Sequence, residues 1–135
     1  MTRHLIITHN GTQYNGTIAT IRTTTFGMED HGLMTFYLQC EWPGAGVGVG
    51  GYVLDSYDEI KKERVGTAYG LDAIKQVLAT VGVERWEDLP GSHVIVLFDD
   101  PNHWGSVVRG IAHPIDEDKV LIFREHSDSW LGDAS

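Results

Sequence analysis

The chain has 135 residues, 41% of them hydrophobic and 21% charged, which is ordinary usage for one globular domain and excludes wholesale disorder. A formal net charge of −9 has the wrong sign for a protein that holds a nucleic-acid polymer by its phosphates. The single cysteine, Cys40, excludes an intramolecular disulfide and a CxxC metal site. No segment resembles a signal peptide or a membrane span. We therefore expect a cytoplasmic protein, with residues 1–129 in one domain and residues 130–135 as a flexible tail.

The first forty residues carry strand signals. Arg3 to His9 is a β-branched run that ends at Asn10-Gly11, and this dipeptide predicts a hairpin turn. The Thr- and Ile-rich segment from Gln13 to Phe26 predicts a long, half-exposed strand. The apolar segment from Leu33 to Gln39 predicts a further strand, which we expect to pair with that long strand.

A glycine-rich stretch, GAGVGVGG, follows at residues 44–51 and continues into Tyr-Val-Leu. Gly46, Gly48 and Gly51 match the spacing G-x-G-x-x-G of a dinucleotide-binding loop. Such a loop needs a helix that opens directly from the glycines, whereas the first helix signal here begins near Ala68. The alternation with valine instead predicts a strand with one face stripped of side chains, which another backbone, an aromatic ring or a ligand can approach closely.

The second half of the chain contains the one clear helix signal. Apolar residues recur at helical spacing from Ala68 to Val81, Thr67 suits the N-cap, and Gly82 suits the left-handed C-terminal stop. Together with the strands, this pattern predicts an α+β fold with an antiparallel sheet, or sheets, of about six to seven strands and the helix packed against them. The remaining predicted elements are a helical turn at Trp86–Leu89 and strands at His93–Phe98, Ser106–Ile115 and Val120–Phe123.

Catalytic and metal-binding patterns are weak. The seven histidines include no HExxH motif and no Cys/His cluster, so we expect neither a metal nor a cofactor. Glu29-Asp30-His31 offers a carboxylate and an imidazole, although such a tripeptide is more often a solvated turn or a structural network. The chain has no G-x-S-x-G elbow, and Cys40 lies in an apolar run without an adjacent base. We therefore expect a protein that is not an enzyme.

The best candidate ligand site follows the strand at His93–Phe98. In the loop DDPNHWG, Trp104 can stack on a base, Asn102 and His103 can make polar contacts, and Arg109 on the next strand can bind a phosphate. The alternative is a Trp that covers the sheet edge and an Arg paired with one of many carboxylates. A second, weaker pair of the same kind consists of Phe26 and Arg22.

Four segments carry a resemblance to a known family: TTTFGMEDHGLMTFYL, GVGVGGYVLD, RVGTAYGLDAIKQVLATVGVERWEDLPG and WGSVVRGIAH, which together span Thr23 to His113. They resemble small proteins of tailed phages and prophages, among them the sponges that counter the Thoeris defence system. The resemblance implies a small α+β oligomer that binds an immune signal of the cyclic ADP-ribose type without destroying it, in the cytoplasm of the infected bacterium. A cationic pocket would then use Arg109, Arg124 or an arginine further upstream.

Three classes of function follow. The first is sequestration of a small nucleotide-type ligand, which requires nanomolar affinity, or about 12 kcal/mol. Because a shallow cleft on one small chain is a poor source of that free energy, we expect a homo-oligomer, a dimer or higher. The second class is an enzyme that degrades the signal through Asp30 and His31. The third is a structural or protein-binding phage component.

Overall fold

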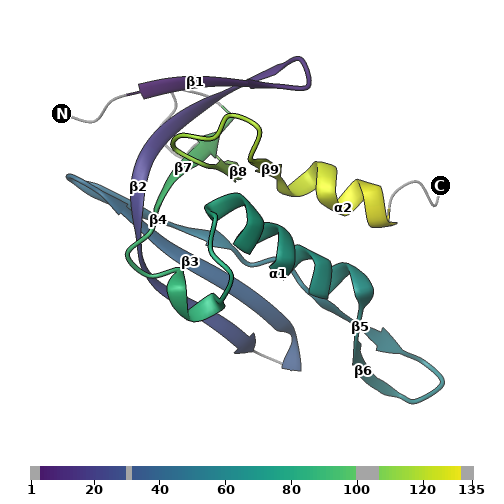
Figure 1. Cartoon of the computed structure of the whole chain (residues 1–135). Coiled ribbons are helices and arrows are strands. Elements are labelled where there is room, and N and C mark those ends of the chain that lie inside the picture. The colour runs from purple at the N-terminus through teal and green to yellow at the C-terminus, as the bar shows by residue number, and fades with distance from the viewer. Residues whose placement is uncertain (1–3, 30–31, 100–106, 132–135) are drawn as a thin grey trace.

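The computed structural model describes residues 4–29, 32–99 and 107–131, and this part of the chain is an α+β fold with helices on one face of an antiparallel sheet (Figure 1). The elements are β1 (His4–His9), β2 (Thr12–Met28), β3 (Met34–Trp42), β4 (Ala45–Gly50), β5 (Asp55–Asp58), β6 (Glu63–Gly66), α1 (Ala68–Val81), the 3-10 turn η2 (Trp86–Asp88), β7 (His93–Phe98), β8 (Val108–Ala112), β9 (Val120–Ile122) and α2 (Phe123–Leu131). The predicted fold class is confirmed. No helix within the described ranges is long and apolar enough to cross a membrane.

The long strand β2 organises the sheet, whose order is β4-β3-β2-β7-β8-β9, with β1 as a seventh strand paired to β2. Asn15 pairs with both β1 and β7, and Thr20 pairs with both β3 and β7. Strand β7 pairs with one edge of β2. The opposite edge therefore pairs first with β1 and then with β3. The 17 residues of β2 bend strongly between these two partners (Figure 1).

A β-bulge at Arg22 decides which β2 side chains face the helices. Ile21 pairs with Cys40 and Thr23 pairs with Gln39, so Arg22 is an extra residue without a partner in β3. In a regular strand, Ile21 and Phe26 would lie on opposite faces, because their separation is odd. The bulge inserts one residue, and both side chains therefore turn toward the helix side of the sheet.

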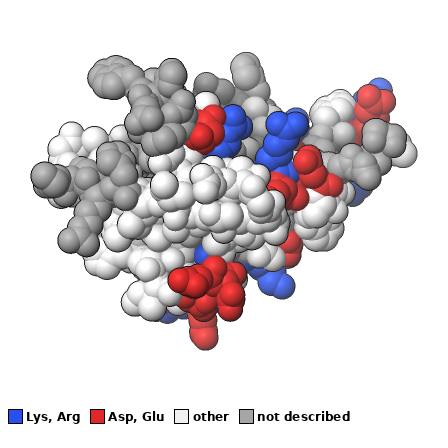
Figure 2. Space-filling model, turned by 90° about the horizontal axis from the view of Figure 1, so that it is seen from above, with Lys and Arg blue, Asp and Glu red and all other residues white. Residues whose placement is uncertain are grey.

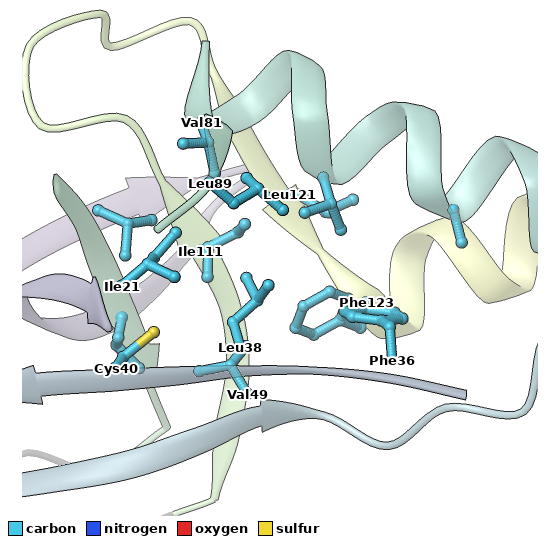
Figure 3. Packing of buried hydrophobic residues seen from close by; sticks show 14 of the residues in the cluster. Ile21, Phe36, Leu38, Cys40, Val49, Val81, Leu89, Ile111, Leu121 and Phe123 are labelled. Atoms are coloured by element: carbon cyan, nitrogen blue, oxygen red, sulfur yellow. The ribbon is translucent and has the colours of Figure 1, made fainter. Parts of the chain in front are cut away.

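The main core lies between the sheet and α1 and continues to the start of α2 (Figure 3). Val94 and Val96 of β7 belong to this core, whereas Ile95 and Leu97 belong to a smaller cluster with Tyr14. Alternating residues of a strand point to opposite faces, so both faces of β7 are buried. The fully buried side chains of the main core include Ile21, Phe36, Leu38, Val49, Val77, Leu89 and Ile111.

The main helix α1 has the bounds predicted from the sequence. Thr67 is the N-cap, and its Oγ1 accepts a 2.9 Å hydrogen bond from the Gly70 amide. Gly82 ends the helix with φ 91°, and its amide donates to the Leu78 carbonyl at 2.8 Å. Both capping predictions are confirmed, because these signals act within one turn of the helix end.

The glycine-rich stretch forms a strand, β4, as predicted, and this strand lies at one edge of the sheet. A Cβ added to Gly46 would lie 2.9 Å from the Cys40 carbonyl oxygen, and one added to Gly48 would lie 3.3 Å from Nε2 of Gln39. Gly51 has φ 84°, and a Cβ there would lie 2.7 Å from the Tyr37 hydroxyl. The close approach that the sequence predicted is therefore made by β3, the neighbouring strand of the same chain.

The hairpin of β5 and β6 is absent from the sequence prediction. Its turn lacks the usual glycine or asparagine signal. Instead, Asp58 accepts hydrogen bonds from the amides of Ile60 (2.8 Å) and Lys61 (3.0 Å), and Lys62 adopts a left-handed φ of 57°. A side-chain-stabilised turn of this kind closes a hairpin that composition alone does not reveal.

The C-terminal prediction is wrong in two respects. The segment expected to continue as a strand through Phe123 starts helix α2 at that residue, and Trp130, assigned to a tail, lies within the same helix. In place of the strand expected at residues 106–115, the described residues form the shorter strand β8, which ends at Ala112. It ends there because the His113 ring accepts hydrogen bonds from the amides of Ile115 and Asp116, which turns the chain.

Candidate ligand-binding site

Three cavities lined by described residues differ in size and charge. The Arg22 groove, of about 500 Å³, is lined by Thr20, Ile21, Arg22, Glu41, Trp42, Pro43 and Gly91. The Phe26 pocket, of about 220 Å³, is lined by Phe26, Met34, Leu54, Asp55, Gly66, Thr67, Gly70, Leu71 and Ile74. The β1 cleft, of about 570 Å³, is lined by residues 5–8, Ile95, residues 112–118 and Val120.

Size and charge favour the Arg22 groove for an anionic small molecule. The Phe26 pocket is smaller than the roughly 300–1,000 Å³ typical of small-molecule sites, and its wall is almost entirely carbon. The β1 cleft is large enough, but its lining includes Asp116, Glu117 and Asp118 and no lysine or arginine. Of these three cavities, the Arg22 groove alone has a cationic side chain in its lining.

The arginine of the groove, Arg22, can exchange its present carboxylate partner for another anion. Nε of Arg22 lies 3.2 Å from Oε2 of Glu41, and the two side chains are 72% and 48% exposed. An ion pair that exposed contributes at most about 1 kcal/mol. Because Arg22 sits at the β-bulge, its side chain leaves the regular ladder and lies in the groove lining instead. An incoming anion can therefore replace Glu41 as its partner at little cost.

The remaining walls of the groove are held in place. Trp42, at the end of β3, is half-buried, and its ring meets that of Phe98 edge to face with centroids 6.2 Å apart. The Gly91 amide donates to the Ile21 carbonyl at 2.7 Å, which ties the turn before β7 to β2. Thr20 Oγ1 lies 3.2 Å from Nδ1 of His93. The groove thus combines an exposed cation with an aromatic ring and a backbone wall that are held by contacts to the rest of the fold.

The groove lining contains no histidine or cysteine. Its polar groups are a guanidinium, a carboxylate, a hydroxyl and backbone amides, which suit binding and hydrogen bonding. In the described ranges, no group of three or more His, Cys, Asp or Glu residues is arranged to hold a metal ion.

The loop predicted as the main ligand site is only partly described. Trp104, Asn102 and His103 lie outside the described residues. Arg109 is described on β8, and its Nη2 lies 3.0 Å from Oδ2 of Asp99. Both side chains are partly exposed, so Arg109 forms the ion pair that the sequence analysis gave as the alternative to anion binding.

The structure separates the second predicted pair. The Phe26 ring lines the Phe26 pocket, with its centroid 5.2 Å from that of Trp86. Arg22 lines the Arg22 groove instead. Arg124 is exposed on α2, with its Nε 4.0 Å from Oδ2 of Asp128. Asp30 and His31, considered for catalysis, lie outside the described residues.

Trp42 and Glu41 were not among the site residues predicted from the sequence. Both belong to β3, and they reach Arg22 only because β2 and β3 pair with a particular register. The one local signal was Trp42-Pro43 at the end of a strand, where an aromatic ring stands beside a turn. The register itself was not readable from composition.

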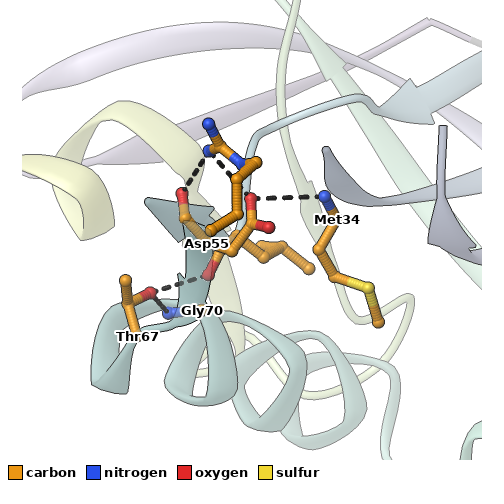
Figure 4. Close-up of polar contacts among 6 residues, drawn as sticks. Met34, Asp55, Thr67 and Gly70 are labelled. Carbon is orange, nitrogen blue, oxygen red and sulfur yellow. Dashed lines mark hydrogen bonds and ion pairs between the residues drawn. The ribbon is translucent and has the colours of Figure 1, made fainter. Parts of the chain in front are cut away.

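A polar cluster at the root of the β5–β6 hairpin holds the wall of the Phe26 pocket (Figure 4). Oδ1 of Asp55 accepts hydrogen bonds from the Met34 amide (3.2 Å) and from Nη2 of Arg64 (3.0 Å). The Arg64 guanidinium holds the pKa of Asp55 below its usual value. Thr67 Oγ1 donates to the Leu54 carbonyl at 2.7 Å. These bonds connect β3, the hairpin and the start of α1.

No protein-family model matches the chain, and comparison with curated proteins and with solved structures found no match either.

Proposed function

We propose that this chain is a phage-encoded anti-defence protein that binds a nucleotide-derived immune signal of the cyclic ADP-ribose type and holds it intact in the cytoplasm of the infected bacterium. The observation that carries the proposal is the Arg22 groove, where an arginine, a carboxylate and a tryptophan line one cavity of about 500 Å³. The resemblance to small phage proteins supplies the biological setting, and we propose a homo-oligomer as the working form.

Three side chains of the groove each suit a different part of such a ligand. The face of Trp42 suits stacking on a purine, a contact worth about 1–3 kcal/mol. Arg22 suits a bidentate contact with a phosphate after it leaves Glu41. Glu41 can then accept a hydrogen bond from a ribose hydroxyl or from the amino group of the base. A compact nucleotide with two phosphates and free hydroxyls fits this set better than a purely anionic ligand does.

Charge on the surface supports a small ligand over a polymer. Figure 2 shows the side of the molecule on which β1 lies, and the described residues there leave a broad uncharged area with acidic and basic side chains at its margins. The described part of this face carries no continuous basic stripe. A nucleic-acid backbone needs such a stripe, whereas one exposed arginine suffices for a single phosphate group.

Calorimetric titration with cyclic ADP-ribose, ADP-ribose and NAD tests the proposal. We expect cyclic ADP-ribose to bind, and we expect Trp42→Ala and Arg22→Ala each to weaken binding at least about tenfold, because each removes about 1.4 kcal/mol or more. Arg85→Ala is the matched control, since Arg85 is also an exposed arginine paired with a carboxylate, Asp88. Loss of binding in Arg109→Ala with full binding in Arg22→Ala would place the site at β8 and overturn the groove assignment.

The fate of the ligand separates sequestration from degradation. After incubation with the protein and heat denaturation, mass spectrometry should recover the signal with unchanged mass. Recovery of products would instead establish an enzyme. If no nucleotide raises the melting temperature, the chain is a structural or protein-binding component, because a ligand at a thousand times its Kd stabilises by about 4 kcal/mol.

A further inference from the structure

The β5–β6 hairpin forms an arm that stands away from the rest of the fold (Figure 1). Within the described residues, β5 and β6 pair only with each other and form a separate two-stranded sheet. Two-stranded hairpins are marginally stable in water unless another surface covers them. A contact with another surface would therefore stabilise the arm.

The tip of the arm has the composition of a contact surface. Ile60 is 92% exposed, and Tyr57 on the same arm is also exposed. Lys61 and Lys62 follow directly and are the only two adjacent Lys or Arg residues in a chain of net charge −9. The tip thus combines an exposed aliphatic side chain with two lysines that are flanked by the acidic residues Asp58, Glu59 and Glu63.

The Phe26 pocket is complementary to that tip. Its lining is almost entirely apolar, and its volume of about 220 Å³ matches a side chain better than it matches a nucleotide. Leu71, on its rim, is 69% exposed. The wall is fixed by the hydrogen bonds of Asp55 and Thr67, so the pocket is formed before anything enters it. This pocket has the properties expected of a socket for one aliphatic side chain.

The pocket lies at the root of the same arm, since Asp55 at the start of β5 and Gly66 at the end of β6 both line it. Ile60 is five residues from Asp55 and six from Gly66, at most roughly 17 Å along β5, and it points into solvent. An arm cannot place its tip at its own root. Two antiparallel arms lying side by side, however, place each tip at the other's root, whatever the length of the arm.

We propose that the chain forms a two-fold symmetric dimer in which Ile60 of each copy inserts into the Phe26 pocket of the other. The contact is isologous, because one chain supplies both the tip and the socket. The dimer does not depend on the ligand proposed above.

Light scattering on the full chain without any nucleotide tests the dimer. We expect the wild type to have the mass of two chains at micromolar concentration. Ile60→Asp and Leu71→Glu, both at exposed positions that leave the core intact, should each raise the dimer dissociation constant by about 100-fold, since every dimer holds two copies of the contact. Ile115→Asp is the matched control, because Ile115 is 85% exposed and lines the β1 cleft.

Mixing the two variants tests the reciprocal geometry. A heterodimer of one Ile60→Asp chain and one Leu71→Glu chain keeps one intact tip and one intact socket that meet each other. Random pairing of equal amounts already gives twice as much heterodimer as either homodimer, so native mass spectrometry should show heterodimers in well more than this twofold excess. A monomeric wild type, a dimer unaffected by Ile60→Asp, or a dimer lost in Ile115→Asp would each overturn the proposal. So would a mixture with no more heterodimer than random pairing gives.

Discussion

Asp72 of α1 and His126 of α2 are joined by a hydrogen bond of 2.8 Å between Oδ2 and Nε2. Trp130, one turn further along α2, donates to the same carboxylate oxygen at 3.2 Å, and the Tyr69 ring packs at 5.3 Å from that of His126. A single acidic side chain of α1 therefore holds one face of α2. Because α2 is rich in polar residues, this anchor matters more for its position than a similar contact would for α1.

The first prediction concerns the pH dependence of this anchor. The bonds from His126 and Trp130 lower the pKa of Asp72. A lowered folded-state pKa means that the carboxylate stabilises the fold above its unfolded pKa of about 3.9, and that this stabilisation is lost as the pH falls through the folded pKa. Asp72→Asn should lower the free energy of unfolding at pH 7 by about 1 kcal/mol, with a smaller difference from wild type in acid.

Urea unfolding followed by circular dichroism, at a series of pH values from 7 down to 3, measures this difference. Asp128→Asn is a suitable control, because Asp128 is exposed on the same helix, where its carboxylate lies 4.0 Å from Nε of Arg124. It should change stability by less than about 0.5 kcal/mol. A difference between Asp72→Asn and wild type that stays constant across the pH series would show that the charge of Asp72 does not contribute.

A second prediction concerns Asp55 and Arg64. The Asp55 side chain is only 10% exposed and binds both Arg64 and the Met34 amide. Nε of Arg64 is already buried without a hydrogen-bond partner among the described residues. Removing the carboxylate would take the charged partner away from the partly buried Arg64 guanidinium. Asp55→Ala should therefore lower the free energy of unfolding by about 2–3 kcal/mol.

A double-mutant cycle isolates that interaction. Arg64→Ala alone and the double variant Asp55→Ala/Arg64→Ala complete it, with stability measured by urea unfolding at neutral pH. We expect the double variant to be less destabilised than the sum of the single variants by at least about 1 kcal/mol. Strict additivity would mean that Asp55 acts through the Met34 amide alone.

The elements that the sequence predicted correctly are those whose signals are local. Thr67, the apolar spacing of α1 and Gly82 lie within one helix, and its bounds agree with the structure at both ends. Helix α2 was missed because its anchor, Asp72, lies 54 residues away from His126 in the chain. The β5–β6 hairpin was missed because the Asp58 side chain, rather than a glycine, forms its turn.

The candidate site shows the same division between local and non-local information. Arg22 and Phe26 were paired as an arginine and an aromatic ring close together in the sequence, and an even spacing would place them on the same face of a regular strand. The bulge at Arg22 breaks that regularity and sends the two side chains to different cavities. Trp42 enters the groove only through the pairing of β3 with β2. Register and bulges depend on the partner strand, so one strand's sequence does not reveal them.

A third prediction concerns Cys40, the single cysteine. Burial in the main core raises the pKa of its thiol to about 12. At pH 8 the reactive thiolate is therefore about a thousandfold scarcer than at an ordinary thiol. Labelling by a chromogenic disulfide reagent should be slower than in guanidinium by at least that factor. Equal rates in native buffer and in denaturant would show that the core around Cys40 opens freely.

The last prediction tests the close contact between the start of α1 and the segment before β5. A Cβ on Gly70 would clash with the carbonyl oxygen of Leu54, which also accepts the Thr67 hydroxyl bond. Alanine would ordinarily stabilise a helix by about 1 kcal/mol relative to glycine. The clash involves backbone, which cannot rotate away, so Gly70→Ala should instead destabilise by about 1–3 kcal/mol.

Gly27→Ala is the control, since no heavy atom lies within 4 Å of its added Cβ, and it should be neutral or slightly stabilising. Thermal and urea unfolding of the two variants distinguish steric exclusion at Gly70 from a general effect of replacing glycine, and a stabilised Gly70→Ala would show that α1 can move away from Leu54.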